Sequence, residues 1–173
     1  MSQREALVRR FSRGWGSGGK ETRCGAGSTL ASTAHIRPHL RALWDRYGVL
    51  SVCDAGAGDL NWIRHVDLTG LTYRAFDLVP RAEGVVELDI TTEPLPACDL
   101  ILCRAVLNHI EPERVRPALD LFKGSARYLL ATQFSTPGKW WRDFAAYDLR
   151  EFDLGEPLEA LTDNPGELAL WRL

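Results

Sequence analysis

Residues 49–58 read Val-Leu-Ser-Val-Cys-Asp-Ala-Gly-Ala-Gly, an apolar run that ends in an acid and two glycines one residue apart. An apolar run without alternation is typical of a strand that is buried on both faces of a parallel sheet. Glycines remove side chains where a backbone must turn sharply and approach a ligand. Because ligands bind beyond the carboxyl ends of such strands, this stretch predicts a ligand site that begins at Asp54.

Two more acids end strand-like segments further along the chain. Thr72–Phe76 leads to Asp77, and Val85–Leu88 leads to Asp89. A carboxylate at the end of the second strand is placed to accept hydrogen bonds from both hydroxyls of a ribose. The alternative for Asp77 is a capping role in a helix or turn.

The acid after the third strand suits an adenine base. Asp89 can accept a hydrogen bond from an exocyclic amine, and Ile90 or Leu78 can pack on the ring face. The alternative is that Asp89 caps a turn at Thr91–Glu93. Together with Asp54, these acids predict a cofactor that contains adenosine.

The spacing of apolar segments predicts an α/β fold with a mostly parallel sheet. Only residues 78–84 separate the second and third strands, too few for a crossover helix, so either one turn bridges them or one strand is misassigned. Residues 138–165 contain no clear strand. The expected strands are Leu50–Asp54, Thr72–Phe76, Val85–Leu88, Leu100–Cys103, Arg127–Thr132 and Glu167–Arg172, and the expected helices are Ser32–Tyr47 (regular from Arg37), Leu60–Val66 and Pro112–Lys123.

Composition indicates one domain of ordinary globular character. The chain has 173 residues, 45% of them hydrophobic, and a net charge of −2. No apolar run approaches the roughly 20 residues that span a bilayer, and Met1–Arg13 lacks the apolar core of a secretory signal. The four cysteines form no CxxC pair, so we expect reduced thiols, a cytoplasmic location and no metal site.

The N-terminal arm, Met1–Thr29, is basic and rich in glycine, and no apolar periodicity is evident in it. It predicts a loop or a mobile arm. Ser17, Gly18 and Ser28 could fold over a bound cofactor as a lid, and a merely flexible tail is the alternative. This arm is also the only stretch suited to the phosphates of a nucleic acid, and a basic tail that is merely solvated is the alternative.

The motifs at Asp54–Gly58, Asp77, Asp89-Ile90 and Asp99–Arg104 resemble, in order and spacing, those of class I S-adenosylmethionine-dependent methyltransferases. Within that superfamily the chain is similar to a group of small bacterial and phage-type enzymes of unknown substrate. The resemblance covers about Ser51–Phe134 and implies a Rossmann-like fold with a mostly parallel twisted sheet and an antiparallel last strand, within the single domain of residues 1–173. It implies S-adenosylmethionine as the cofactor, with Asp77 on its ribose. The chain departs from the family in the reduced connection between strands 2 and 3 and in the missing strand 6.

The resemblance also indicates the site residues. Arg104 could hold the methionine carboxylate or an acidic substrate, and an ordinary salt bridge is the alternative. His109 could act as a general base, since imidazole titrates near neutrality, and a capping or packing role is the alternative. The cofactor residues implied are Asp54, Ala55, Gly56, Gly58, Asn61, Trp62, Asp77, Leu78, Asp89, Ile90, Cys103, Arg104, Ser17, Gly18 and Ser28.

These expectations favour methyl transfer to a small molecule, or to a group that a macromolecule presents, because the chain has no large inserted substrate domain. One alternative is a regulatory or partner protein that binds S-adenosylmethionine without catalysis. An NAD protein is disfavoured because Asn61 stands at the third glycine position of GxGxxG. DNA amino-methylation is disfavoured because residues 103–106 read Cys-Arg-Ala-Val in place of Asn/Asp-Pro-Pro-aromatic. A protein-glutamate methyltransferase is a minor alternative, and the oligomeric state is not indicated.

Overall fold

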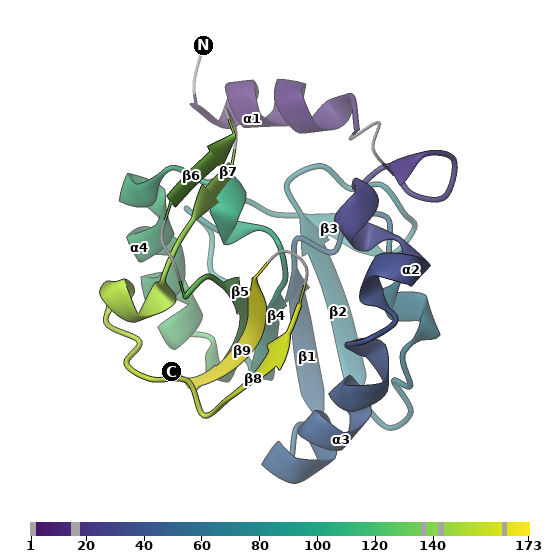
Figure 1. Cartoon of the computed structure of the whole chain (residues 1–173), viewed down its shortest axis with the longest axis vertical. Coiled ribbons are helices and arrows are strands. Elements are labelled where there is room, and N and C mark those ends of the chain that lie inside the picture. The colour runs from purple at the N-terminus through teal and green to yellow at the C-terminus, as the bar shows by residue number, and fades with distance from the viewer. Residues whose placement is uncertain (1–2, 15–17, 136–137, 142–143, 164–165) are drawn as a thin grey trace.

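The computed structural model describes residues 3–14, 18–135, 138–141, 144–163 and 166–173. Its centre is a seven-stranded sheet with the order β3-β2-β1-β4-β5-β9-β8 (Figure 1). The first five strands pair in parallel, and β9 is antiparallel to both β5 and β8. The predicted α/β class is therefore confirmed. The strands are β1 (Ser51–Ala55), β2 (Thr72–Asp77), β3 (Val85–Glu87), β4 (Cys98–Cys103), β5 (Ala126–Gln133), β8 (Glu159–Thr162) and β9 (Glu167–Arg172).

Strand β8 corrects the expectation that no sixth strand lies in residues 138–165. It pairs with β9 through the register Glu159↔Leu170 to Thr162↔Glu167 and forms the far edge of the sheet. Its residues alternate between half-buried and exposed, because this edge strand pairs only with β9 and one of its faces is open to solvent. A segment of four residues with this composition has too short an apolar pattern to predict a strand from the sequence.

Helices cover both faces of the sheet. On one face α3 (Arg37–Tyr47) buries Leu40, Leu43 and Trp44 against strand residues of β1, β4 and β5. It begins with Pro38 in its first turn and ends at Gly48, as expected. On the other face α4 (Pro112–Lys123) packs its apolar side against the same strands. These two layers hold the carboxyl ends of β1, β2 and β4 in fixed positions.

The connection from β2 to β3 is a short loop over residues 78–84 without a helix. The two strands nonetheless pair in parallel, with Asp77 opposite Glu87. Of the two explanations considered for this spacing, the short bridge is confirmed and both strands are correctly assigned.

The helix expected over residues 60–66 is wrong. A 3₁₀ turn, η3 (Ile63–His65), is all that forms there. Leu60 has a φ of 61°, a left-handed conformation that an α-helix cannot continue through. The chain leaves the glycine loop through a series of turns, so Asp59 does not lie at a helix N-terminus.

The N-terminal arm is also more regular than expected. It contains helix α1 (Gln3–Ser12) and a 3₁₀ turn η2 (Ala26–Ser28), and a short helix α2 (Leu30–Thr33), which the side chain of Thr29 caps, follows directly after the arm. Leu7 of α1 is buried, and Leu7 and Phe11 share one face at a spacing of four residues. Figure 1 shows α1 across the end of the sheet. A separate two-stranded hairpin is formed by β6 (Gly138–Trp141) and β7 (Phe144–Ala146).

None of the helices in the described ranges is both long enough and apolar enough to cross a membrane. All four cysteines are unpaired. The described residues contain no cluster of three His, Cys, Asp or Glu side chains that could hold a metal ion.

Candidate functional site

The loop after β1 has a backbone that only glycine adopts easily. Gly56 has a φ of 94° and Gly58 a φ of 61°. A Cβ on Gly56 would lie 2.2 Å from Cγ2 of Val106, and one on Gly58 would lie 2.5 Å from Sγ of Cys24. Both glycines are therefore required by their conformation and by close neighbours.

Hydrogen bonds hold the N-terminal arm against this loop. The Asp59 carboxylate accepts hydrogen bonds from Oγ1 of Thr22 at 2.7 Å and from the backbone N–H of Arg23 at 2.9 Å. Although burial by itself would raise the pKa of Asp59, these hydrogen bonds lower it. The Asn61 amide donates to the Glu21 carboxylate at 2.8 Å and to the carbonyl of Ser28 at 2.9 Å. Residues 21–28 thus form an ordered cover over the loop.

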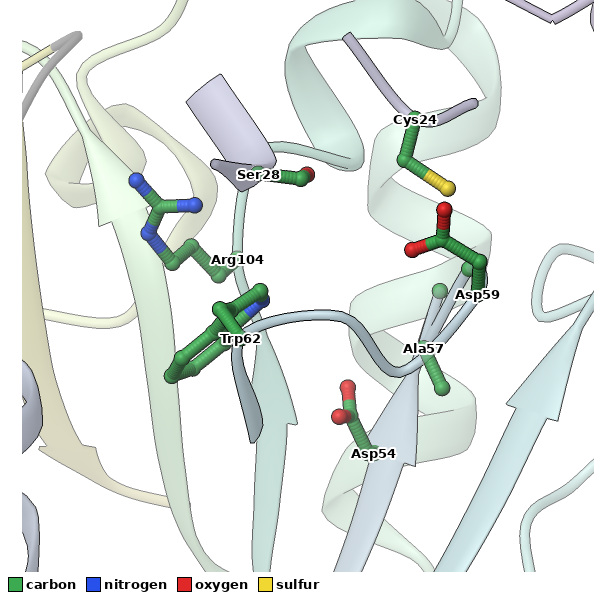
Figure 2. A pocket seen from close by; sticks show the side chains of 9 residues that line it. Cys24, Ser28, Asp54, Ala57, Asp59, Trp62 and Arg104 are labelled. Atoms are coloured by element: carbon green, nitrogen blue, oxygen red, sulfur yellow. The ribbon is translucent and has the colours of Figure 1, made fainter. Parts of the chain in front are cut away.

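A pocket lies between the loop, the end of β4 and this cover. Figure 2 shows Trp62 and Arg104 on one side of it, Cys24 and Asp59 on the other, and Asp54 below the loop. The enclosed cavity is small, with a volume of about 20 Å³. The cover leaves this site narrow. The lining residues are Cys24, Ser28, Asp54, Gly56, Ala57, Gly58, Asp59, Trp62 and Arg104.

Arg104 forms a buried ion pair at the wall of the pocket. Its Nε and Nη2 donate to the two carboxylate oxygens of Asp163 at 2.7 and 2.9 Å, and its Nη1 donates to the carbonyl of Gly27 at 2.9 Å. The side chains of Arg104 and Asp163 are 3% and 0% exposed. The guanidinium also lies 5.5 Å from the centre of the Trp62 ring. Arg104 therefore joins β4, the segment after β8 and the N-terminal cover, which is the salt-bridge alternative of the sequence analysis.

Asp54 is the most strongly perturbed acid of the pocket. Burial raises its pKa to about 7, and the nearby charge of Asp77 acts in the same direction. A hydrogen bond from the Tyr73 hydroxyl to Oδ2, at 2.5 Å, opposes this rise only in part. An acid with such a pKa is poised to change its charge when a ligand cation or hydrogen-bond donor arrives.

Asp77 is held by the backbone on both sides of it. Its Oδ2 accepts from the N–H of Gly58 at 2.9 Å, and its Oδ1 accepts from the N–H of Val79 at 2.8 Å. Burial raises the pKa of Asp77, and these two bonds partly offset the rise. Each carboxylate oxygen keeps a further lone pair. The ribose contact stays a prediction, but the carboxylate is already oriented.

Asp89 has the capping role that the sequence analysis gave as its alternative. Its Oδ1 accepts from the backbone N–H of Thr91 at 3.0 Å and from the Thr91 hydroxyl at 2.6 Å, and Arg114 lies 3.4 Å from Oδ2. Ile90 beside it is buried and Leu78 is half-buried. Contacts of these residues with adenine stay predictions.

His109 ends the 3₁₀ turn η4 (Leu107–His109), which follows β4. Its ring is half-buried and meets Phe11 of α1 edge-on, at 6.1 Å between ring centres. Ala105, just before η4, has a φ of 55°, a strained conformation for a residue other than glycine. The chain thus turns sharply at the end of β4, as it does at Leu60 after the glycine loop.

The predicted site residues divide into two groups. Ser28, Asp54, Gly56, Gly58, Trp62 and Arg104 line the pocket together. Ala55, Asn61, Asp77, Leu78, Asp89, Ile90, Cys103, His109 and Gly18 do not line it, although Asn61 and Asp77 hold its walls. Ser17 lies outside the described residues.

Sequence reasoning missed Cys24 as a wall of the pocket and Asp163 as the partner of Arg104. The glycines around Cys24 were a usable signal, because small residues let the arm approach the loop closely. Asp163 carried no signal, since it follows a strand that the sequence does not mark.

The strand order, with an antiparallel β9 beside β5 and a glycine loop after β1, is that of the class I S-adenosylmethionine-dependent methyltransferase fold. Solved structures of such enzymes match this chain at low sequence identity. The 1,6-didemethyltoxoflavin-N1-methyltransferase of Burkholderia thailandensis, with bound 1,6-didemethyltoxoflavin and S-adenosylhomocysteine, matches at a TM-score of 0.67 and 18% identity, over 98% of this chain and 86% of that one.

Two further structures have the same fold. Magnesium protoporphyrin IX methyltransferase of Synechocystis, with bound S-adenosylhomocysteine, matches at a TM-score of 0.60 and 15% identity over 88% of this chain and 84% of its own. Mitomycin 7-O-methyltransferase matches at 0.55 and 14% over 99% and 68%. No protein-family model and no curated protein matches the sequence.

Proposed function

We propose that this protein transfers a methyl group from S-adenosylmethionine to a small-molecule acceptor. One observation carries the proposal: on this strand order, the glycine loop brings a buried acid, Asp54, and a backbone-held acid, Asp77, to the same edge of the sheet. Ligands bind at that edge in open α/β sheets.

The residues present fit such a cofactor. The glycine loop after β1 keeps its tight conformation because Gly56 and Gly58 have no Cβ, and this loop lines the pocket beside Asp54. Asp77 would accept from the ribose hydroxyls, and Asp54 would accept from a cationic or N–H group of the cofactor. When bound, S-adenosylmethionine supplies an activated methyl group on a sulfonium.

The protein's own residues then have two tasks, to align the acceptor and to exclude water. The cover of residues 21–28 would exclude water. This cover must open to admit a nucleoside, because the volume of the pocket is smaller than that of pockets that hold ligands of this size. His109 would take a proton from a hydroxyl or ammonium acceptor.

A small acceptor is favoured by the size of the insertion between β5 and β8. It consists of the β6–β7 hairpin and a 3₁₀ turn, η5 (Leu149–Phe152). The names of two structural neighbours specify didemethyltoxoflavin and mitomycin, which are small molecules. The reduced connection between strands 2 and 3 and a missing sixth strand would favour the non-catalytic alternative, and the second of these grounds is lost because the sixth strand is present as β8.

Calorimetric titration with S-adenosylhomocysteine tests the cofactor site. Asp77→Ala is expected to weaken binding by about 1–3 kcal/mol, because it removes hydrogen bonds to a charged group. Asp120→Asn, on the exposed side of α4, is the matched control and should bind as the wild type does. Equal affinity for the Asp77 variant would contradict the ribose assignment.

Turnover tests the catalytic part. With an acceptor that the wild type methylates, His109→Ala should lower the rate and leave the affinity for S-adenosylhomocysteine unchanged. Full activity in this variant would remove His109 as the base.

A further inference from the structure

The side-chain amide of Asn108, in the middle of η4, is buried and makes no hydrogen bond to any of the described residues. Asn108 is 3% exposed, and neither its Nδ2 nor its Oδ1 has a partner in the part of the chain that the structure describes. Buried amides are nearly always paired, because an unmade hydrogen bond away from water is costly. Asn108 does not line the pocket described above, and its two unpaired atoms make it a candidate contact for a ligand that binds beside η4.

Among the side chains of the described residues, this amide differs from the other buried amide with an unpaired atom. Gln133 keeps its Nε2 bonded to Glu167 at 2.9 Å, and only its Oε1 is unpaired. Asn61, near the same pocket, donates twice. Asn108 alone of these three leaves both its donor and its acceptor unused, so no local structural role accounts for it.

The 3₁₀ turn η4 that contains Asn108 lies between the glycine loop after β1 on one side and α1 and β7 on the other. Val106, two residues earlier, lies against Gly56. His109, the next residue, meets Phe11 of α1, and β7 packs on η4. A molecule that reaches this amide would enter between η4 and those two elements, next to His109.

We propose that Asn108 binds the acceptor and selects one with a neutral donor–acceptor edge, such as the adjacent N–H and C=O of a lactam in a heteroaromatic ring. This rests on the proposed methyl transfer. An amide offers both an acceptor and donors, which match such an edge in two parallel hydrogen bonds. A charged group is the poorer match, since Asn108 carries no charge and its burial makes an unpaired charge expensive.

The first experiment measures thermal stability of the full chain. Asn108→Leu keeps the branching at Cγ and the number of side-chain heavy atoms and removes the two unpaired polar groups, so its Tm should rise by about 2–5 °C. Asn61→Leu is the matched control, and its Tm should fall because its amide is hydrogen-bonded. A fall for Asn108→Leu as well would show a structural role and overturn the inference.

The second experiment measures two bicyclic probes by calorimetry on protein saturated with S-adenosylhomocysteine. 4-Hydroxy-2-quinolone carries a lactam edge, and 1-naphthol has a hydroxyl on a similar ring system without one. The wild type should bind the quinolone about tenfold more tightly, and the difference should vanish in Asn108→Leu. Asn108→Ala, which cannot clash, is measured beside it in case the leucine variant does not fold.

Equal affinities in the wild type, including no binding of either probe, would overturn the proposed acceptor class, and so would a preference that persists in both variants. Failure of the methyltransferase proposal itself gives a different result. In that case S-adenosylhomocysteine does not bind, the same probes are titrated into the free protein, and the stability comparison still reports on the amide.

Discussion

The buried carboxyl group of Asp54 should make the stability of this protein fall as the pH rises from acid to neutral. Burial raises its pKa from the ordinary value of 3.8 to about 7 in the folded state. Between these two values the folded state keeps a proton that the unfolded state has lost, so the free energy of unfolding decreases with pH. The full stabilisation is present below about pH 4, and the decrease ends above about pH 7.

The size of this effect follows from the shift. A difference of about three pKa units corresponds to about 4 kcal/mol, of which about 3 kcal/mol falls between pH 5 and pH 8. Asp54→Asn removes the titration, and its amide oxygen can still accept from the Tyr73 hydroxyl. The free energy of unfolding of the variant, minus that of the wild type, should therefore grow by about 3 kcal/mol over this range.

Urea unfolding at pH 5, 6, 7 and 8 measures this difference, and other titrating groups cancel in the subtraction. Asp120→Asn, an exposed carboxylate on α4, serves as the control and should show a constant difference. A constant difference for Asp54→Asn would refute the reasoning, because it would mean that Asp54 ionises in the folded chain as it does in the unfolded one.

Three further outcomes are expected. If cofactor binding requires ionised Asp54, calorimetry should find S-adenosylhomocysteine binding about tenfold weaker at pH 6 than at pH 8, with no such dependence in Asp54→Asn. Chemical unfolding should show Arg104→Met destabilised by about 3–5 kcal/mol, because the buried carboxylate of Asp163 loses the two hydrogen bonds that Arg104 donates to it, and the added change Asp163→Leu should recover most of the loss; a double variant no more stable than the single one contradicts this. Gly56→Ala should cost about 3 kcal/mol through its clash with Val106, whereas Gly70→Ala, also at positive φ but in open space, should cost about 1 kcal/mol; equal losses would show that backbone conformation alone matters.

Local sequence was sufficient where burial on two faces leaves a strong pattern. The continuous apolar runs of β1, β4 and β5 predicted central parallel strands, and Gly48 and Pro38 marked the ends of α3. The pattern failed where an element has one neighbour or a strained backbone. Strand β8 escaped notice because an edge strand needs little apolar surface, and the helix after the glycine loop was predicted in error because nothing in the sequence revealed the left-handed Leu60.

Local sequence predicted the central strands of the sheet, the acids at three strand ends and the glycines between them, because these depend on local periodicity and on the conformational freedom of glycine. The tertiary structure alone decided that Asp163 pairs with Arg104, that residues 21–28 cover the pocket, and that the amide of Asn108 is left without a partner among the described residues. Each of these depends on contacts between segments far apart in the chain. Such contacts are set by the packing of the whole domain, and no window of sequence contains them.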